Sequence, residues 1–204
     1  MVEKHLAISF QSSKDALEFL EYLKKHISDE NLVVTIRGNR LKISINAAKA
    51  DAESLLQKIK AKMSEWKASR QIEKGFHKVP LGYVLSMASM RISIPLNAFI
   101  DALNLKGYKS ELKGKYVLTK LETGKLIEEL ERFSEHYSQA IYLDAYPIVK
   151  RIAAILMFVK KIGIEEVLEF LRKKNIIDSD EQGRARLRVN YRDALKILEN
   201  EVRG

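Results

Sequence analysis

Hydrophobic residues in the first part of the chain follow two periods. The segment HLAISF (residues 5–10) has an apolar residue at every second position, which is typical of a strand with one buried face. Residues 12–27 instead carry apolar side chains at helical spacing, and Ser12 or Ser13 can cap that helix. Two more alternating runs follow, LVVTI and RLKISI. They are joined by Arg37-Gly38-Asn39-Arg40, which is typical of a tight hairpin turn.

A long helix is predicted from about Asp51. Its apolar positions recur every three or four residues and define one face of the helix, which we expect to be buried. They are Leu55, Leu56, Ile59, Met63 and Trp66. The segment therefore predicts the element order β-α-β-β-α, which we assign to a first module, residues 1–72.

A related pattern recurs twice in the rest of the chain. Residues 71–80 contain Gly75 and Pro80, and we expect them to form a linker. After it, the order of a helix, a basic strand led by glycine and a second helix appears twice, about 70 residues apart. These copies predict a second module, residues 73–140, and a third module with an additional helical segment, residues 141–204.

Individual residues indicate where the helices of these modules begin and end. Thr123 and Asn190 are expected to cap helices, with Asp193 at the third helical position of the last one. Pro147 is expected to open the buried helix that contains IAAILMFV, and Gly163 to close it. The fold class predicted overall is α/β (α+β), with small antiparallel sheets backed by helices.

The positive charge is concentrated in two segments. The chain of 204 residues has 36 Lys and Arg against 27 Asp and Glu, a net charge of +9. Residues 106–125 contain six Lys and two Glu, and residues 172–192 contain seven basic and three acidic residues, so each segment has a net charge of +4. Excess charge confined to short segments is typical of a binding patch.

The basic strands are the candidate binding surface. On regular strands, alternate cations share one face and can bind phosphate oxygens. The predicted nucleic-acid-binding residues are Arg184, Arg186, Arg188, Arg40, Lys42, Lys113 and Lys115. The alternative is that these residues form the solvated face of small sheets, or protect their edges from aggregation. The strand that contains Arg184, Arg186 and Arg188 argues against this alternative. A merely solvated face is expected to mix charges of both signs, and no acidic residue lies between Gly183 and Arg192.

Residue types needed for catalysis or metal binding do not occur in recognisable patterns. The chain has no cysteine, and its four histidines are too far apart in sequence to form a ligand set. No phosphate loop, GxGxxG, GxSxG or HExxH sequence is present. We therefore expect no catalytic activity, no cofactor and no metal site. The sequence shows no signal peptide or membrane span, so we expect a cytoplasmic protein with no membrane partner.

The first seventy residues resemble a known family. RGNRLKISINA, followed by Asp51 and an amphipathic helix, is similar to the hairpin and helix of the small dimerising subunit of the KEOPS complex, which makes threonylcarbamoyladenosine on tRNA. Ile36, Gly38, Leu41, Ile43, Ile45 and Ala47 stand at positions of that kind. The whole chain also resembles an uncharacterised archaeal family, which implies thermophilic origin. These resemblances imply a role linked to tRNA or translation, without chemistry.

Three functions follow from these observations, in order of preference. The first is non-catalytic RNA binding, to tRNA or rRNA, through cationic strand faces. The second is an interaction or scaffold role, in which Leu55, Ile59, Met63 and Trp66 form a homodimer or bind a protein partner. The third is winged-helix DNA binding, because the last sixty residues read as helix–turn–helix–strand.

Overall fold

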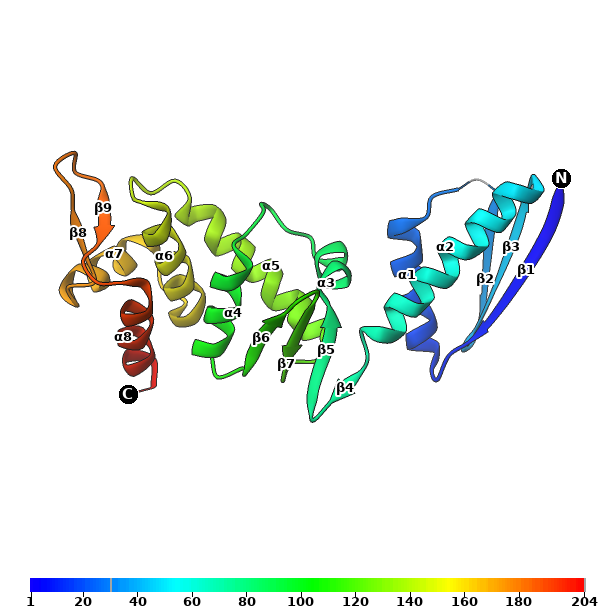
Figure 1. Cartoon of the computed structure of the whole chain (residues 1–204), viewed down its shortest axis with the longest axis horizontal. Helices are drawn as coiled ribbons and strands as arrows, with labels where there is room; N and C mark the ends of the chain where they lie inside the picture. The colour runs from blue at the N-terminus through cyan, green and yellow to red at the C-terminus, as the bar shows by residue number, and fades with distance from the viewer. Residues whose placement is uncertain (30, 204) are drawn as a thin grey trace. The chain divides into compact units, whose positions relative to one another are not determined.

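The computed structural model describes residues 1–29 and 31–203, and the chain divides into two compact units, residues 1–71 and 72–204 (Figure 1). The first unit has the predicted β-α-β-β-α order. Its elements are β1 (Val2–Ser9), α1 (Ser13–His26), β2 (Leu32–Arg37), β3 (Arg40–Ala47) and α2 (Lys49–Ala68).

The first unit is a three-stranded antiparallel sheet with two helices on one face. The strand order is β1-β3-β2, and α1 and α2 both contact β3 (Figure 1). Burial alternates along the central strand, where Leu41, Ile43 and Ile45 are fully buried and the residues between them are more accessible. Helices on one face leave the other face open, which is the arrangement expected for alternating strands.

Aromatic side chains fill the core of the first unit. The ring centroid of Trp66 lies 5.3 Å from that of Phe10 and 5.7 Å from that of Phe19, with both pairs near edge-to-face geometry. The start of α1 is fixed by the capping box of Ser12 and Asp15, in which each side chain accepts the backbone N–H of the other residue. Of the two residues expected to cap this helix, Ser12 and Ser13, Ser12 is the cap.

The second unit contains the remaining twelve elements of the described chain. They are β4 (Ile72–Glu73), β5 (Phe76–Pro80), α3 (Leu81–Met87), α4 (Leu96–Leu105), β6 (Ser110–Lys113), β7 (Tyr116–Thr119), α5 (Thr123–Ala140), α6 (Pro147–Lys160), α7 (Ile164–Lys173), β8 (Ile177–Ser179), β9 (Ala185–Leu187) and α8 (Tyr191–Arg203). The strands form a four-stranded antiparallel sheet of order β4-β5-β7-β6 and a separate hairpin, β8-β9.

Helix α6 is the centre of the second unit's core. It contacts α4, α5, α7 and α8, and every residue from Ile152 to Phe158 is buried. The ring of Phe133 packs between Phe99 and Phe158, at centroid distances of 5.6 and 5.5 Å. The elements of the predicted second and third modules thus share one helix. The predicted mixed α/β fold with small antiparallel sheets is confirmed.

The same order of helix, hairpin and helix occurs three times along the chain. It comprises α1-β2-β3-α2, α4-β6-β7-α5 and α7-β8-β9-α8. Each hairpin turn contains a glycine with positive φ, at Gly38, Gly114 and Gly183. Positive φ costs a glycine far less than any residue with a Cβ atom, so these positions favour glycine.

The second and third copies also share the way their first helix ends. Gly107 and Asn175 both have positive φ. In each case the next residue donates its N–H to a carbonyl five residues earlier, from Tyr108 to Leu103 and from Ile176 to Leu171, both at 2.9 Å. This is the 6→1 bond of a Schellman motif.

Three local predictions were wrong. The expected linker 71–80 folds as hairpin β4-β5, with Lys74 and Gly75 both at positive φ in its turn. Helix α5 already includes Thr123, and Glu122 is the residue before it. Lys161, at φ 58°, ends α6 rather than Gly163, which instead precedes α7. Pro147 does open α6, and Asn190 Oδ1 accepts the Asp193 N–H at 3.0 Å, as predicted.

Candidate nucleic-acid interface

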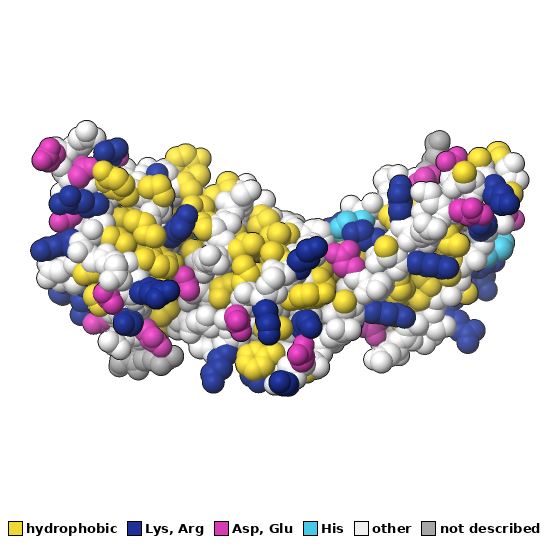
Figure 2. Space-filling view, viewed as in Figure 1, with side chains coloured by type: hydrophobic (Ala, Val, Ile, Leu, Met, Phe, Trp, Pro, Cys, Tyr) yellow, Lys and Arg dark blue, Asp and Glu magenta, His cyan; other side chains and the backbone are white. Residues whose placement is uncertain are grey.

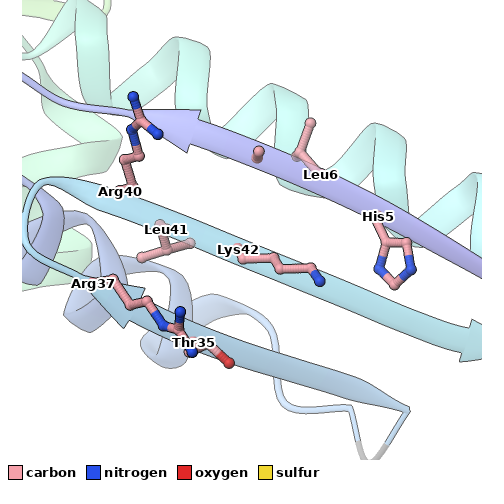
Figure 3. A pocket seen from close by; sticks show the side chains of 8 residues that line it. His5, Leu6, Thr35, Arg37, Arg40, Leu41 and Lys42 are labelled. Carbon is pink, nitrogen blue, oxygen red and sulfur yellow. The ribbon is translucent and has the colours of Figure 1, made fainter.

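Three cations gather at one end of the open face of sheet β1-β3-β2. Arg37 ends β2, Arg40 begins β3, and Lys42 follows on the same face of β3. In the strand register Arg37 is opposite Arg40, and Lys42 is opposite Thr35 on one side and Ala7 on the other. Figure 3 shows these side chains on the face of the sheet that lies away from α2.

Two hydrogen bonds to Phe10, the residue that follows β1, hold the end of the sheet that carries the cations. The Phe10 N–H donates to the Asn39 carbonyl at 2.9 Å, and Asn39 Nδ2 donates to the Phe10 carbonyl at 2.8 Å. The two-residue turn Gly38–Asn39 is therefore tied to the neighbouring strand. A fixed turn also fixes the backbone from which Arg37 and Arg40 project.

The acidic side chains of the described residues leave these three cations unpaired. Within the described residues, Arg37, Arg40 and Lys42 have no carboxylate oxygen within 4.0 Å. The acid on the same face, Glu3, is paired in register with Asn46 at the far end of β3 and lies 3.6 Å from His5. Ser9, the partner of Arg40, lies six positions further along β1, a distance of about 20 Å at strand rise.

The cations surround a cavity of about 420 Å³ on this face. Its lining includes Ala7, Thr35 and His5 as well as the three cations (Figure 3). Because Ala7 and Thr35 are small, the long side chains of Arg37, Arg40 and Lys42 stand above the level of the sheet. The Thr35 hydroxyl and His5 ring add hydrogen-bonding groups. A concave, cationic and hydrogen-bonding surface of this kind suits phosphate oxygens.

The arginines of hairpin β8-β9 are in a different electrostatic environment. Asp178 lies directly opposite Arg186, and its Oδ1 accepts from Arg186 Nε at 2.8 Å. The same carboxylate lies 3.9 Å from Arg188 Nε, whose guanidinium also donates to Asn175 Oδ1 at 3.3 Å. This hydrogen bond from Arg186 to Asp178 raises the pKa of Arg186. The acidic partner, Asp178, lies on the neighbouring strand β8. The sequence of β9 alone therefore does not reveal that Arg186 is paired.

Arg184 is also paired. Its Nε donates to Asp180 Oδ2 at 3.3 Å, and its guanidinium carbon lies 5.0 Å from the ring centroid of Tyr146. Desolvation raises the pKa of Asp180, but hydrogen bonds from the Arg184 backbone N–H and the Tyr146 hydroxyl outweigh it and leave the pKa below its ordinary value. Asp180 is therefore ionised at neutral pH and offsets the charge of Arg184.

The two predicted lysines of the middle hairpin lie next to each other in sheet β4-β5-β7-β6. Lys113 is exposed at the end of β6, opposite Tyr116, and Lys115 is exposed in the turn that follows. Neither has an acidic partner within 4.0 Å among the residues that the structure describes. Lys113 belongs to a surface that also contains aromatic side chains, described below.

The residues predicted to form a protein interface on α2 lie mainly in the core. Leu55, Ile59 and Trp66 are buried, and Met63 is partly buried. Their helical spacing is that of the face that packs on the first sheet, and this is the physical reason that three of them are inaccessible to a partner. The exposed face of α2 carries charged residues such as Lys58 and Lys60.

Arg37 was not among the predicted site residues. In sequence it reads as part of the turn, and its role appears only when the hairpin register pairs it with Arg40. A two-residue turn fixes that register, so the pairing was available as a signal from Gly38–Asn39. Net charge was a poor guide, because this cluster lies outside both strongly basic segments.

Other kinds of site have no support in the part of the chain that the structure describes. No group of three or more His, Cys, Asp or Glu side chains there could hold a metal ion. None of the helices described is long and apolar enough to cross a membrane.

Fold and site together define a class: a two-unit α/β protein with an open sheet face that carries unneutralised cations. The chain belongs to a family of uncharacterised proteins conserved in archaea (DUF2067), whose family model matches residues 8–196. The expected archaeal family is thereby confirmed. No curated protein and no solved structure matches the chain, and the expected resemblance to the KEOPS subunit has no support from these comparisons.

Proposed function

We propose that this protein binds RNA, without catalysis, by contacting the phosphate backbone through the open face of sheet β1-β3-β2. The observation that carries the proposal is the cluster of Arg37, Arg40 and Lys42, three cations without acidic partners among the described residues. An arginine fork matches two phosphate oxygens, and each neutralised phosphate releases counterions.

The shape of the surface favours RNA over duplex DNA. The major groove of B-DNA admits a helix or a two-stranded ribbon, and this face is a sheet of three strands. A broad open sheet suits the accessible backbone of single-stranded or looped RNA. The described part of this face carries no Phe, Tyr or Trp, so it supports recognition of the backbone and not of base sequence.

The proposal is tested by measuring the affinity of the full chain for bulk tRNA by fluorescence anisotropy. We expect the triple variant Arg37→Ala, Arg40→Ala, Lys42→Ala to bind at least about tenfold more weakly, because charged hydrogen bonds to phosphate are lost. The matched control removes three exposed lysines from α2, which covers the opposite face of the sheet: Lys58→Ala, Lys60→Ala, Lys67→Ala. Equal losses in the two variants would overturn the proposal, as would tRNA binding that neither variant changes.

A further inference from the structure

The second sheet has an open face of different chemistry. On one side of sheet β4-β5-β7-β6 the side chains of Val79, Val117 and Thr119 are buried, and α3 and α4 contact strands of this sheet. The register places another set of residues together on the opposite side. These are Phe76, Lys78, Tyr116, Leu118, Lys120, Glu111 and Lys113. Figure 2 shows hydrophobic side chains among basic and acidic ones over these strands.

Cations lie over both rings of this face. Lys120 Nζ is 4.2 Å from the ring centroid of Phe76, and Lys78 Nζ is 5.1 Å from that of Tyr116. The aromatic side chains are therefore held among positive charges rather than packed into the core. Aromatic rings between lysines on an open sheet are the arrangement that stacks nucleobases and pairs with their phosphates.

A cavity of about 390 Å³ lies on this face. Phe76 and Leu118 supply its apolar lining, and the exposed lysines Lys74, Lys109 and Lys113 stand around it. The described residues provide none of these lysines with a carboxylate within 4.0 Å. A partly apolar surface bordered by three lysines is complementary to a flat base attached to a phosphate chain.

The two acids at the cavity, Glu73 and Glu111, offset only part of this charge, because three lysines stand around it and the carboxylate of Glu73 is engaged first by Lys78 and only then by the charges of Lys113 and Lys74. Glu73 is held by Lys78 at 3.1 Å, and the hydrogen bond and charge of Lys78 lower the pKa of Glu73. Glu111 also lines the cavity, and its carboxylate is an acceptor for an exocyclic amino group of a base.

We propose that this cavity receives an unpaired base of single-stranded RNA, which stacks on Phe76 while Lys74, Lys109 and Lys113 contact the flanking phosphates. The inference rests on the proposed RNA binding and adds to it a second site, which contacts bases. The two sheets then differ in what they recognise, because the rings belong to the second sheet and the isolated cation cluster to the first.

The test compares two probes of equal phosphate number, a short single-stranded oligoadenylate and its abasic analogue, each bound to the full chain. We expect Phe76→Leu, which keeps an apolar side chain but removes the ring, to weaken oligoadenylate binding about five- to a hundredfold, the range measured for stacking of one base. Binding of the abasic probe should not change, and Phe76→Tyr should restore binding of the oligoadenylate. A Lys113→Ala variant, which leaves the sheet's apolar residues intact, should weaken binding of both probes.

The outcomes separate this inference from the proposed function. If the wild-type chain binds both probes with equal affinity, and Phe76→Leu changes neither, base stacking is excluded while backbone binding stands. If the wild-type chain binds neither probe nor tRNA, both proposals fail. Circular dichroism of Phe76→Leu and Phe76→Tyr checks that each variant is folded.

Discussion

Arg37 and Arg40 are cross-strand partners next to the two-residue turn of hairpin β2-β3. Like charges directly opposite each other destabilise a sheet, and within the described chain neither guanidinium has a carboxylate to offset the repulsion. Asp178 and Arg186 hold the equivalent relationship in hairpin β8-β9 with opposite charges. The first pair is therefore available to an external anion, and the second is already neutralised.

This contrast predicts unequal effects of two single substitutions. Arg40→Ala should weaken tRNA binding about tenfold, since a charged hydrogen bond to phosphate is lost. Arg186→Ala should weaken it less than about threefold, because its guanidinium is engaged with Asp178. Both arginines are exposed residues of strands, which makes them a matched pair. Titrations with one labelled tRNA at one salt concentration measure the two effects, and a larger loss for Arg186→Ala would reverse the assignment of the site.

Trp66 tests whether α2 serves the core or an interface. Its side chain is buried beside Phe10 and Phe19, so Trp66→Ala should lower the free energy of unfolding by about 3–5 kcal/mol through the cavity left behind. The molar mass measured by light scattering should be the same for the variant and the wild type. A dimer that Trp66→Ala dissociates, with little change in stability, would instead show that this helix forms a protein interface.

The fold of the first unit was predictable because local patterns and tertiary packing agree there. Alternation in β3 and helical spacing in α2 both follow from one buried face, and the Ser12 cap acts within four residues. Strands β6 and β8 carry only one large apolar side chain each, Leu112 and Ile177, in three or four residues, which is too few to show a period in the sequence. Residues 71–80 form hairpin β4-β5 and not the expected linker, because sequence alone does not distinguish a glycine in a tight turn from a glycine in a linker.

The candidate site was only partly predictable for a different reason. The charges along one strand do not reveal which charges lie on the strand paired with it. The sequence therefore suggests that Arg186 has no acidic partner, although Asp178 neutralises it. Lys42 and Arg40 were identified correctly as residues of one strand face. Their significance depends on Arg37, which joins them only through the hairpin register.

Two glycine substitutions should have opposite effects on stability. Gly38 has φ 58° in its turn, where alanine is strained, so Gly38→Ala should lower the free energy of unfolding by about 1–2 kcal/mol. Gly124 lies in the first turn of α5, with nothing within 4 Å of the added Cβ atom. Gly124→Ala should raise the free energy of unfolding by about 0.5–1 kcal/mol. Urea unfolding measures both, and stabilisation by Gly38→Ala would show that the turn does not require positive φ.

The pair of Asp101 and Tyr191 predicts a dependence of stability on pH. The Tyr191 hydroxyl donates to Asp101 Oδ2 at 2.8 Å, and burial raises the pKa of Asp101 above its ordinary value of 3.8 despite that hydrogen bond. The stability contributed by the protonated carboxyl is complete below pH 3.8 and is lost as the pH rises through the folded-state pKa. Asp101→Asn, which keeps an acceptor but no charge, should therefore gain in Tm relative to the wild type as the pH rises from about 3 to about 7.

Tyr191→Phe is the companion variant for this pair. It leaves the half-buried carboxylate without its donor, so it should lower the free energy of unfolding at neutral pH by about 1–3 kcal/mol. Differential scanning calorimetry across the pH range measures both variants. If the Tm of Asp101→Asn relative to that of the wild type falls as the pH rises, the raised pKa of Asp101 is contradicted.

The dependence of tRNA affinity on salt tests the central claim most directly. Each phosphate contact contributes about 0.7 to 0.9 to the slope of log affinity against log salt concentration. The wild-type slope should therefore exceed that of the Arg37→Ala, Arg40→Ala, Lys42→Ala variant by about two to three. The Lys58→Ala, Lys60→Ala, Lys67→Ala control should keep the wild-type slope. Identical slopes for the wild type and the first variant would contradict phosphate binding at the open face of sheet β1-β3-β2.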